Sequence, residues 1–177
     1  MAFSVTTSIE APAARVFDVI SDPLTYPDWL LGAQRIRKVD PSWPKPGAAF
    51  HHTVGAGPIR ISDRTSVLAL DPPRSLELRA HIGPVGSARV IFTLTEEHGI
   101  TEVDLEERPD GGLMRVLWST LGRAALALGI WGRNGASLQQ LKTYIETGAG
   151  ADDDGPADSG TGPRASRRAN DTIEPVR

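Results

Sequence analysis

Two polar residues in the second half of the chain fall at positions that turn toward a protein core. Glu107 follows Val103 and Leu105 at the two-residue period of a half-buried strand, so alternation directs its side chain inward. Asn134 lies on an apolar stripe of helical period, with Arg133 beside it. Such a patch in an apolar pocket could orient a hydroxyl or carbonyl, or supply a carboxylate for general acid-base chemistry. The simpler interpretation, which we favour, is that Glu107 pairs with Arg133 or a neighbouring arginine and Asn134 satisfies strand-end backbone groups.

His52 and Asp63 are two further polar candidates, and the same alternation directs both of them inward. His52 stands between Phe50 and Val54, and Asp63 follows an isoleucine at a spacing of two. The long strand that holds Asp63 is expected to contain a β-bulge, which would turn this side chain to the other face. Glu107, His52 and Asp63 are therefore the candidates for catalysis, although no firm constellation joins them.

Metal, nucleotide and covalent chemistry find no matching pattern. His51 and His52 are adjacent and point to opposite faces of a strand, and no spacing in the chain matches a zinc site. The chain has no cysteine, which removes thiolate ligands and cysteine nucleophiles. It has no G-x-S-x-G, and the run Gly55-Ala56-Gly57 lacks the lysine of a phosphate-binding loop. We expect no metal and no cofactor.

The elements that would position these residues form one sheet and three helical segments. Alternating runs separated by Gly and Pro predict strands at residues 3–10, 34–41, 48–54, 59–70, 75–82, 87–96 and 101–108. After the first strand, Pro12 suits the first turn of a helix, and a second helical piece spans residues 23–31. Strands that follow one another so closely pair as hairpins. The order predicts an α+β fold in which a curved, seven-stranded antiparallel sheet wraps a terminal helix.

The stretch 113–147 carries the longest helical signal, an apolar stripe with spacings of three and four residues. A single helix of this length would run to about 50 Å, longer than the predicted strands can cover. We therefore divide it at Gly129 and Gly132, which mark a break or a bend, because each costs about 1 kcal/mol relative to Ala inside a helix. Residues 131–147 are the helix that the sheet holds, and residues 113–128 form a lid over the pocket or a dimer surface.

The composition of the chain distinguishes a folded part from a polar tail, and it limits the classes of partner that we expect. We expect one domain over residues 1–147 and a disordered polar tail over residues 148–177. The formal charge of -3 lacks the basic excess of a nucleic-acid binder. The apolar segment 116–131 is too short for a membrane span of about 20 residues, and residues 1–11 lack the pattern of a signal peptide. The expected protein is cytoplasmic and is a monomer or a weak homodimer.

A resemblance to a known superfamily rests on four passages: IEAPAARVFDVISDPLTYPDWL, VGAGPIRISDRT, LALDPPRSLELRA and RNGASLQQLKTYIE. With the order of elements, these passages resemble the START-like, or polyketide cyclase/dehydrase (SRPBCC), superfamily over residues 1–147. The resemblance implies the helix-grip fold. Because this superfamily includes lipid carriers, hormone receptors, cyclases and stress proteins, the resemblance leaves the function open.

The resemblance also implies a deep, mostly apolar cavity between the concave sheet and the terminal helix. The side chains expected to line or close this cavity are Trp29, Phe50, His52, Leu78, Phe92, Leu105, Glu107, Trp131, Asn134 and Leu138. A filled core would use the same apolar residues. Three functions stay open. The first is binding of a small hydrophobic polyketide-, lipid- or isoprenoid-like molecule, the second is a cyclase, aromatase or dehydrase that uses Glu107, His52 and Asn134, and the third is a regulatory or stress-related interaction protein without a ligand.

Overall fold

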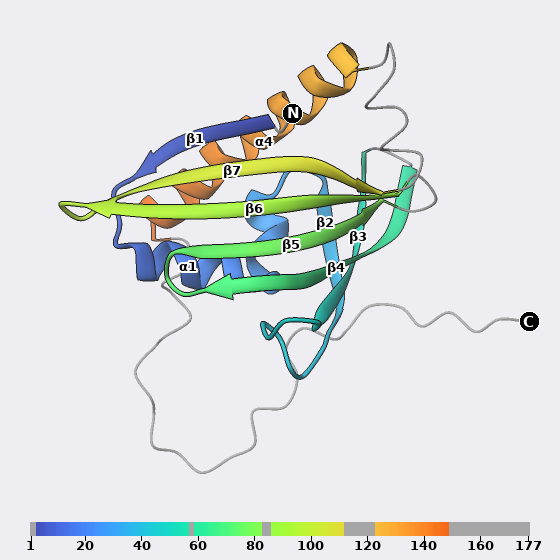
Figure 1. Cartoon of the computed structure of the whole chain (residues 1–177), viewed down its shortest axis with the longest axis horizontal. Helices are drawn as coiled ribbons and strands as arrows, with labels where there is room; N and C mark the ends of the chain where they lie inside the picture. Colours follow the sequence, from blue (N-terminus) through green and yellow to red (C-terminus); the bar gives the residue numbers. More distant parts are fainter. Residues whose placement is uncertain (1–2, 57–58, 83–85, 112–122, 149–177) are drawn as a thin grey trace, which may run out of the picture.

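The computed structural model describes residues 3–56, 59–82, 86–111 and 123–148 of the 177-residue chain. Across these residues, seven strands form one sheet in the order β1-β7-β6-β5-β4-β3-β2 (Figure 1). The strand bounds are β1 Phe3–Ile9, β2 Ala33–Val39, β3 Ala49–Ala56, β4 Ile59–Asp71, β5 Ser75–Ile82, β6 Gly86–Glu97 and β7 Ile100–Gly111. All neighbouring strands are antiparallel, so the predicted α+β fold is confirmed.

Helical segments lie between β1 and β2 and at the end of the described chain. Their bounds are α1 Ala13–Ser21, the 3-10 turn η1 Pro23–Thr25, α2 Tyr26–Trp29 and α4 Arg123–Glu146. The buried face of α1 includes Val16, Phe17, Val19 and Ile20. This helix begins at Ala13, one residue later than predicted, and Pro12 is its N-cap residue. The Ala13 N–H donates to the Glu96 carboxylate of β6 at 2.7 Å, which satisfies a helix-start donor that the proline side chain cannot serve.

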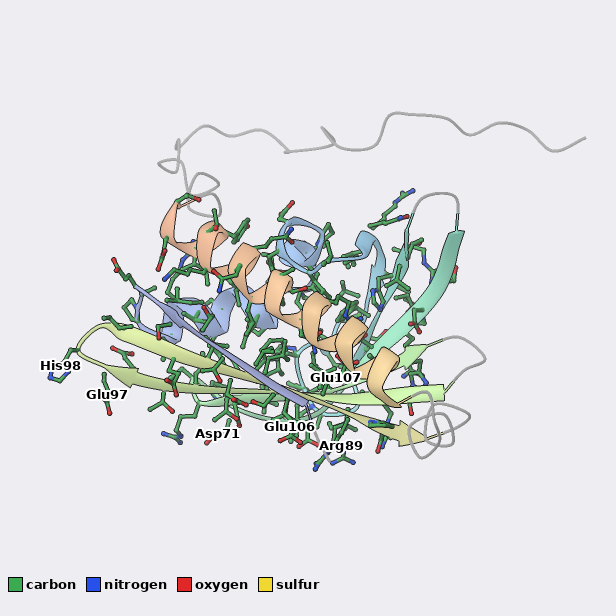
Figure 2. All side chains as sticks on the ribbon, turned by 90° about the horizontal axis from the view of Figure 1, so that it is seen from above. Asp71, Arg89, Glu97, His98, Glu106 and Glu107 are labelled. Carbon is green, nitrogen blue, oxygen red and sulfur yellow. The ribbon has the colours of Figure 1, made fainter. Side chains whose placement is uncertain are left out.

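The core lies between the concave face of the sheet and one side of α4. Leu76 of β5 pairs with Phe92 of β6, which in turn pairs with Leu105 of β7, so their side chains form an apolar row across three strands. The residues that α4 adds to this buried cluster are Leu138, Leu141 and Ile145. Figure 2 shows α4 along one face of the sheet, with Arg89 and Glu106 on the opposite face. This is the helix-grip arrangement.

The predicted break inside the terminal helix is wrong, because α4 runs without interruption through Gly129 and Gly132. Each glycine lowers helix stability by about 1 kcal/mol but does not exclude helical backbone angles. A helix that is already nucleated therefore extends through such positions. Residues 113–122 of the predicted lid or dimer surface lie outside the described residues, and the backbone of residues 123–128 belongs to α4. The predicted tail, residues 149–177, also lies outside them.

The predicted strand limits agree with the observed limits to within three residues, and the largest difference is at the end of β7. The prediction ended this strand at Arg108, directly before Pro109, a residue that cannot donate to a β-ladder. In the structure Pro109 pairs with Ala88, directly beside a register shift between Ser87 and Ala88. The extra residue at this shift is Asp110 of β7, and β7 continues to Gly111.

Truncation of the α4 side chain at the centre of the core tests the importance of this packing. Leu141 is fully buried, so Leu141→Ala is expected to lower the free energy of unfolding by about 2–5 kcal/mol. The matched variant Gln140→Ala, at an exposed position of the same helix, is expected to change it by less than about 0.5 kcal/mol. Urea unfolding followed by circular dichroism measures both. Equal stabilities of the two variants would contradict the described packing of α4.

Candidate functional site

A cavity of about 420 Å³ lies between the concave face of the sheet, α4 and the segment that joins α2 to β2. This volume is typical of sites that bind small molecules. The cavity wall consists of Tyr26, Trp29, Leu30, Leu31, Gly32, Ala33, His52, Val54, Asp63, Thr65, Leu78, Ala80, Val90, Phe92, Leu105, Glu107, Arg133 and Asn134. Every strand from β2 to β7 contributes to it, so the curvature of the sheet shapes the cavity.

Apolar side chains from the middle of the sheet make up most of the wall. Leu78 of β5 pairs with Val90 of β6, and Phe92 lies two residues further along β6 on the same face. The Trp29 ring of α2 packs edge-on against Phe92, with the ring centroids 6.3 Å apart. Its Nε1–H donates to Thr25 Oγ1 at 3.0 Å, which fixes the ring orientation. The polar edge of this tryptophan is thus satisfied within the protein, and its fully buried ring forms part of the cavity wall.

Glu107, Asn134 and Arg133 form a hydrogen-bonded cluster where β7 meets α4. Arg133 Nη2 and Asn134 Nδ2 donate to Glu107 Oε2 at 2.6 and 2.9 Å. Asn134 Oδ1 in turn accepts from Arg133 Nε at 3.2 Å and from Nη2 at 3.1 Å. Glu107 is 4% exposed, and Figure 2 shows it between the sheet and α4 while Glu106 points to the other face. The two donors offset the cost of burying the carboxylate.

The inward orientation predicted for Glu107 and Asn134 agrees with these positions. The ion pair between Glu107 and Arg133, the simpler of the two interpretations, is present at 2.6 Å. The role expected for Asn134 is wrong, because its amide donates to the Glu107 carboxylate and not to strand-end backbone. The apolar stripe of a helix and the alternation of a strand each predict the direction in which a side chain points. Neither predicts which partner that side chain bonds across the cavity.

A second polar group lies on β3 and β4, separated from Glu107 by the apolar parts of β5 and β6. His52 and Asp63 are direct cross-strand partners, and Thr65 is two residues further along β4. Thr65 Oγ1 lies 3.2 Å from His52 Nε2, and Asp63 Oδ1 accepts a hydrogen bond from the Arg64 N–H at 2.8 Å. The three inward side chains are all buried. The cavity therefore has two polar ends and an apolar middle.

The β-bulge expected in β4 is present but does not affect Asp63. The register shift lies between Val67 and Ala69, beyond Asp63 along the strand. Asp63 and Thr65 therefore keep the inward face that strand alternation gives them. Thr65 was not among the predicted site residues, although its place two residues after Asp63 carried the signal that could have found it.

His52 is held in its neutral form near pH 7. Burial, and to a smaller extent the charges of Arg37 and His51, lower the pKa of its imidazole from 6.5 to about 4. Nδ1 is buried and has no hydrogen-bond partner among the described residues, so a second ring proton would have no acceptor there. Neutral His52 is therefore a weak base that shares one hydrogen bond with Thr65.

Two of the predicted pocket residues, Phe50 and Leu138, do not line the cavity wall, and the prediction for Trp131 stays untested. Phe50 is fully buried in an aromatic group, with the ring centroids of Tyr26 and Trp43 each 5.1 Å from its own. Leu138 is buried one helical turn beyond Asn134, where α4 packs directly on the sheet. The side chain of Trp131 lies outside the described residues. The other seven predicted residues lie in the cavity wall, as does Asp63.

Within residues 3–56, 59–82, 86–111 and 123–148, no group of three His, Asp or Glu side chains could hold a metal ion. In the same part of the chain, no helix combines the length and apolar character that a membrane crossing requires. The charged side chains in the cavity wall are Asp63, Glu107 and Arg133.

The fold and the cavity define a helix-grip protein with an internal pocket. The chain belongs to the family described as polyketide cyclase / dehydrase and lipid transport, which it matches over residues 1–146. A search of curated protein sequences gives no match. Among solved structures, protein NE0264 from Nitrosomonas europaea is similar, with 13% identity, a TM-score of 0.65 and coverage of 85% of this chain and 97% of that chain.

Two other solved structures extend this likeness. Protein CV1439 from Chromobacterium violaceum has 17% identity and a TM-score of 0.60, with coverage of 82% of this chain and 98% of that chain. The di-domain ARO/CYC BexL from the BE-7585A biosynthetic pathway has 16% identity and a TM-score of 0.61, with coverage of 82% of this chain and 50% of that chain. At such identities the likeness establishes the fold alone.

The low pKa of His52 predicts a loss of stability in acid. Between pH 6.5 and about 4, unfolded chain binds a proton at this histidine that folded chain does not bind, so stability falls as the pH falls through this window. The full pKa shift of His52 corresponds to a change of about 3 kcal/mol in the free energy of unfolding. Urea unfolding at pH 7 and at pH 4 should therefore show a larger acid loss for the wild type than for His52→Gln. Equal losses in the two proteins would contradict the neutral, buried state of His52.

Proposed function

We propose that this protein binds a small, largely apolar molecule in the cavity beneath α4. The observation that carries the proposal is an open cavity of about 420 Å³ where a filled core would have served the fold equally well. Protein interiors are close-packed, and voids much larger than a water molecule are few. A cavity of this size with apolar walls and a small number of convergent polar groups is the usual form of a small-molecule site.

The chemistry of the wall supports the same proposal. The surfaces of Leu78, Val90 and Phe92 would remove apolar ligand area from water, at about 25 cal/mol for each Å² buried. Trp29, whose indole N–H is already bonded to Thr25, is fully buried and supports Phe92 by edge-on packing. The family description names both cyclases or dehydrases and lipid transport, and both activities require that a hydrophobic molecule enter the protein. Polyketide-, lipid- and isoprenoid-like molecules all meet these requirements.

A second candidate function is catalysis of the cyclase, aromatase or dehydrase type. The observation in its favour is the buried Glu107 carboxylate, which contributes to the cavity wall beside Asn134. Arg133 and Asn134 already share its Oε2, so one of its two carboxylate oxygens is engaged within the protein. Neutral His52 is a weak base at pH 7. Binding alone requires no proton transfer by these side chains, and we therefore place binding before catalysis.

A turnover assay separates catalysis from binding. Incubation with a linear poly-β-ketone thioester should, for an enzyme, give a cyclised or dehydrated product faster than the protein-free reaction. Glu107→Gln should then lose most of that acceleration, whereas Glu106→Gln, on the other face of β7, should keep it. A wild-type rate equal to the protein-free rate would favour binding without catalysis. An interaction protein without a ligand is the third candidate, and the open cavity does not favour it.

Blocking the cavity from within the sheet tests the proposed binding. Val90 lines the cavity, and Thr93 of the same strand is exposed on the opposite face. Val90→Trp is expected to lower the affinity for the neutral fluorescent probe N-phenyl-1-naphthylamine at least about tenfold, because the new ring occupies cavity volume. Thr93→Trp should bind the probe as the wild type does. Probe fluorescence measures the affinity, and circular dichroism checks that both variants fold.

Two results would overturn the proposed binding in the cavity. If the wild type does not bind the probe, or if Val90→Trp binds it as tightly as Thr93→Trp, the cavity is not the site of binding. The third candidate function would then account for the family fold better than the first.

A further inference from the structure

The polar end of the cavity at β7 presents a carboxylate that two side-chain donors hold. Both donors of the cluster, Arg133 Nη2 and Asn134 Nδ2, bond to the same carboxylate oxygen, Oε2 of Glu107. Neither hydrogen bond uses Oε1. Because Glu107 is 96% buried and contributes to the cavity wall, a molecule in the cavity would meet this carboxylate without competing bulk water.

The donors around Glu107 are already engaged with each other and with the carboxylate. Asn134 Oδ1 accepts from Arg133 Nε and Nη2, which holds the guanidinium against the amide and the carboxylate together. Arg133 is therefore committed to a carboxylate of the protein, and its side chain is 44% exposed at the edge of the cavity. A ligand carboxylate placed beside Glu107 would be repelled by the like charge. The two carboxylates would also have to share Arg133 as their counter-ion.

The rest of the wall fits a ligand whose body is apolar. Leu78, Val90 and Phe92 separate the Glu107 end from the end formed by His52 and Thr65. Near pH 7 neutral His52 adds no positive charge that could attract an anion. In the described wall, the guanidinium of Arg133 is the one cationic group, and Glu107 already binds it.

We infer that the cavity selects an uncharged hydrophobic molecule that carries a hydroxyl group, and that the hydroxyl donates a hydrogen bond to Glu107. A carboxylate of the same shape is excluded. This inference rests on the proposed binding function and makes it more specific, because it distinguishes hydroxylated hydrophobes from hydrophobic acids such as fatty acids. Glu107 is then a specificity-determining residue. Arg133 and Asn134 are positioning residues that act through its carboxylate.

Three naphthalenes of nearly the same shape test the inference: 2-naphthol, 2-methylnaphthalene and 2-naphthoate. Each competes at pH 7 for the cavity of the full-length wild type against N-phenyl-1-naphthylamine, whose fluorescence falls on displacement. A hydrogen bond to a buried charged group corresponds to about tenfold in affinity, so 2-naphthol should bind about tenfold more tightly than 2-methylnaphthalene. The anion 2-naphthoate should bind at least about tenfold more weakly than 2-naphthol.

Glu107→Gln keeps the length and shape of the side chain but removes its charge. In this variant the ratio of the 2-naphthoate dissociation constant to that of 2-naphthol should fall at least about fivefold, because like-charge repulsion is gone. The matched variant Glu106→Gln changes the neighbouring carboxylate on the opposite face of β7 and should keep the wild-type ratio. The wild-type selectivity alone decides the inference if Glu107→Gln does not fold.

Each remaining outcome counts against a defined part of the account. If neither the fluorescent probe nor any naphthalene binds, the proposed function is overturned together with the inference. If the three naphthalenes bind equally, the cavity binds hydrophobes and only the selection by Glu107 is overturned. If 2-naphthoate binds most tightly, Arg133 is the anchor for an acid, and the inference is overturned while binding stands.

Discussion

The structure depends on how α4 is held over the concave face of the sheet, and the two parts of the helix are held by different interactions. Toward its C-terminal end, Leu141 and Ile145 are buried in the core, so the helix and the sheet are in direct apolar contact. About two turns before Leu141, Asn134 and Arg133 bond to the Glu107 carboxylate. A hydrogen-bonded contact between polar side chains holds helix and strand together without filling the space beside it, and the cavity opens there.

This division explains why buried polar groups are tolerated at both ends of the cavity. Glu107 is paired with a cation and an amide, which offsets much of the cost of removing a carboxylate from water. His52 avoids that cost by staying neutral, since burial holds its pKa at about 4. Between these ends the wall is apolar, and Trp29 closes it with a ring whose polar atom is satisfied elsewhere. A ligand with an apolar body and little charge is complementary to such a wall.

The fold could be predicted from the sequence because its signals are local. Strand alternation predicted the inward positions of Glu107 and His52, and turn residues placed the strand limits within three residues. The partners of Asn134 could not be predicted, because they depend on how α4 meets β7 across long sequence distances. The position of the register shift near Val67 and the continuity of α4 through Gly132 also escaped prediction. In both cases packing decides between local conformations of similar free energy.

The most direct test of a ligand-filled cavity is native mass spectrometry of the full-length protein purified from its own host without denaturation. The account predicts a species heavier than the polypeptide by the mass of one small molecule, which is released when the protein is denatured. The released molecule should be largely apolar, should carry a hydroxyl group and should have no carboxylate. Repeated recovery of the bare polypeptide under gentle conditions, or release of a hydrophobic acid, would contradict it.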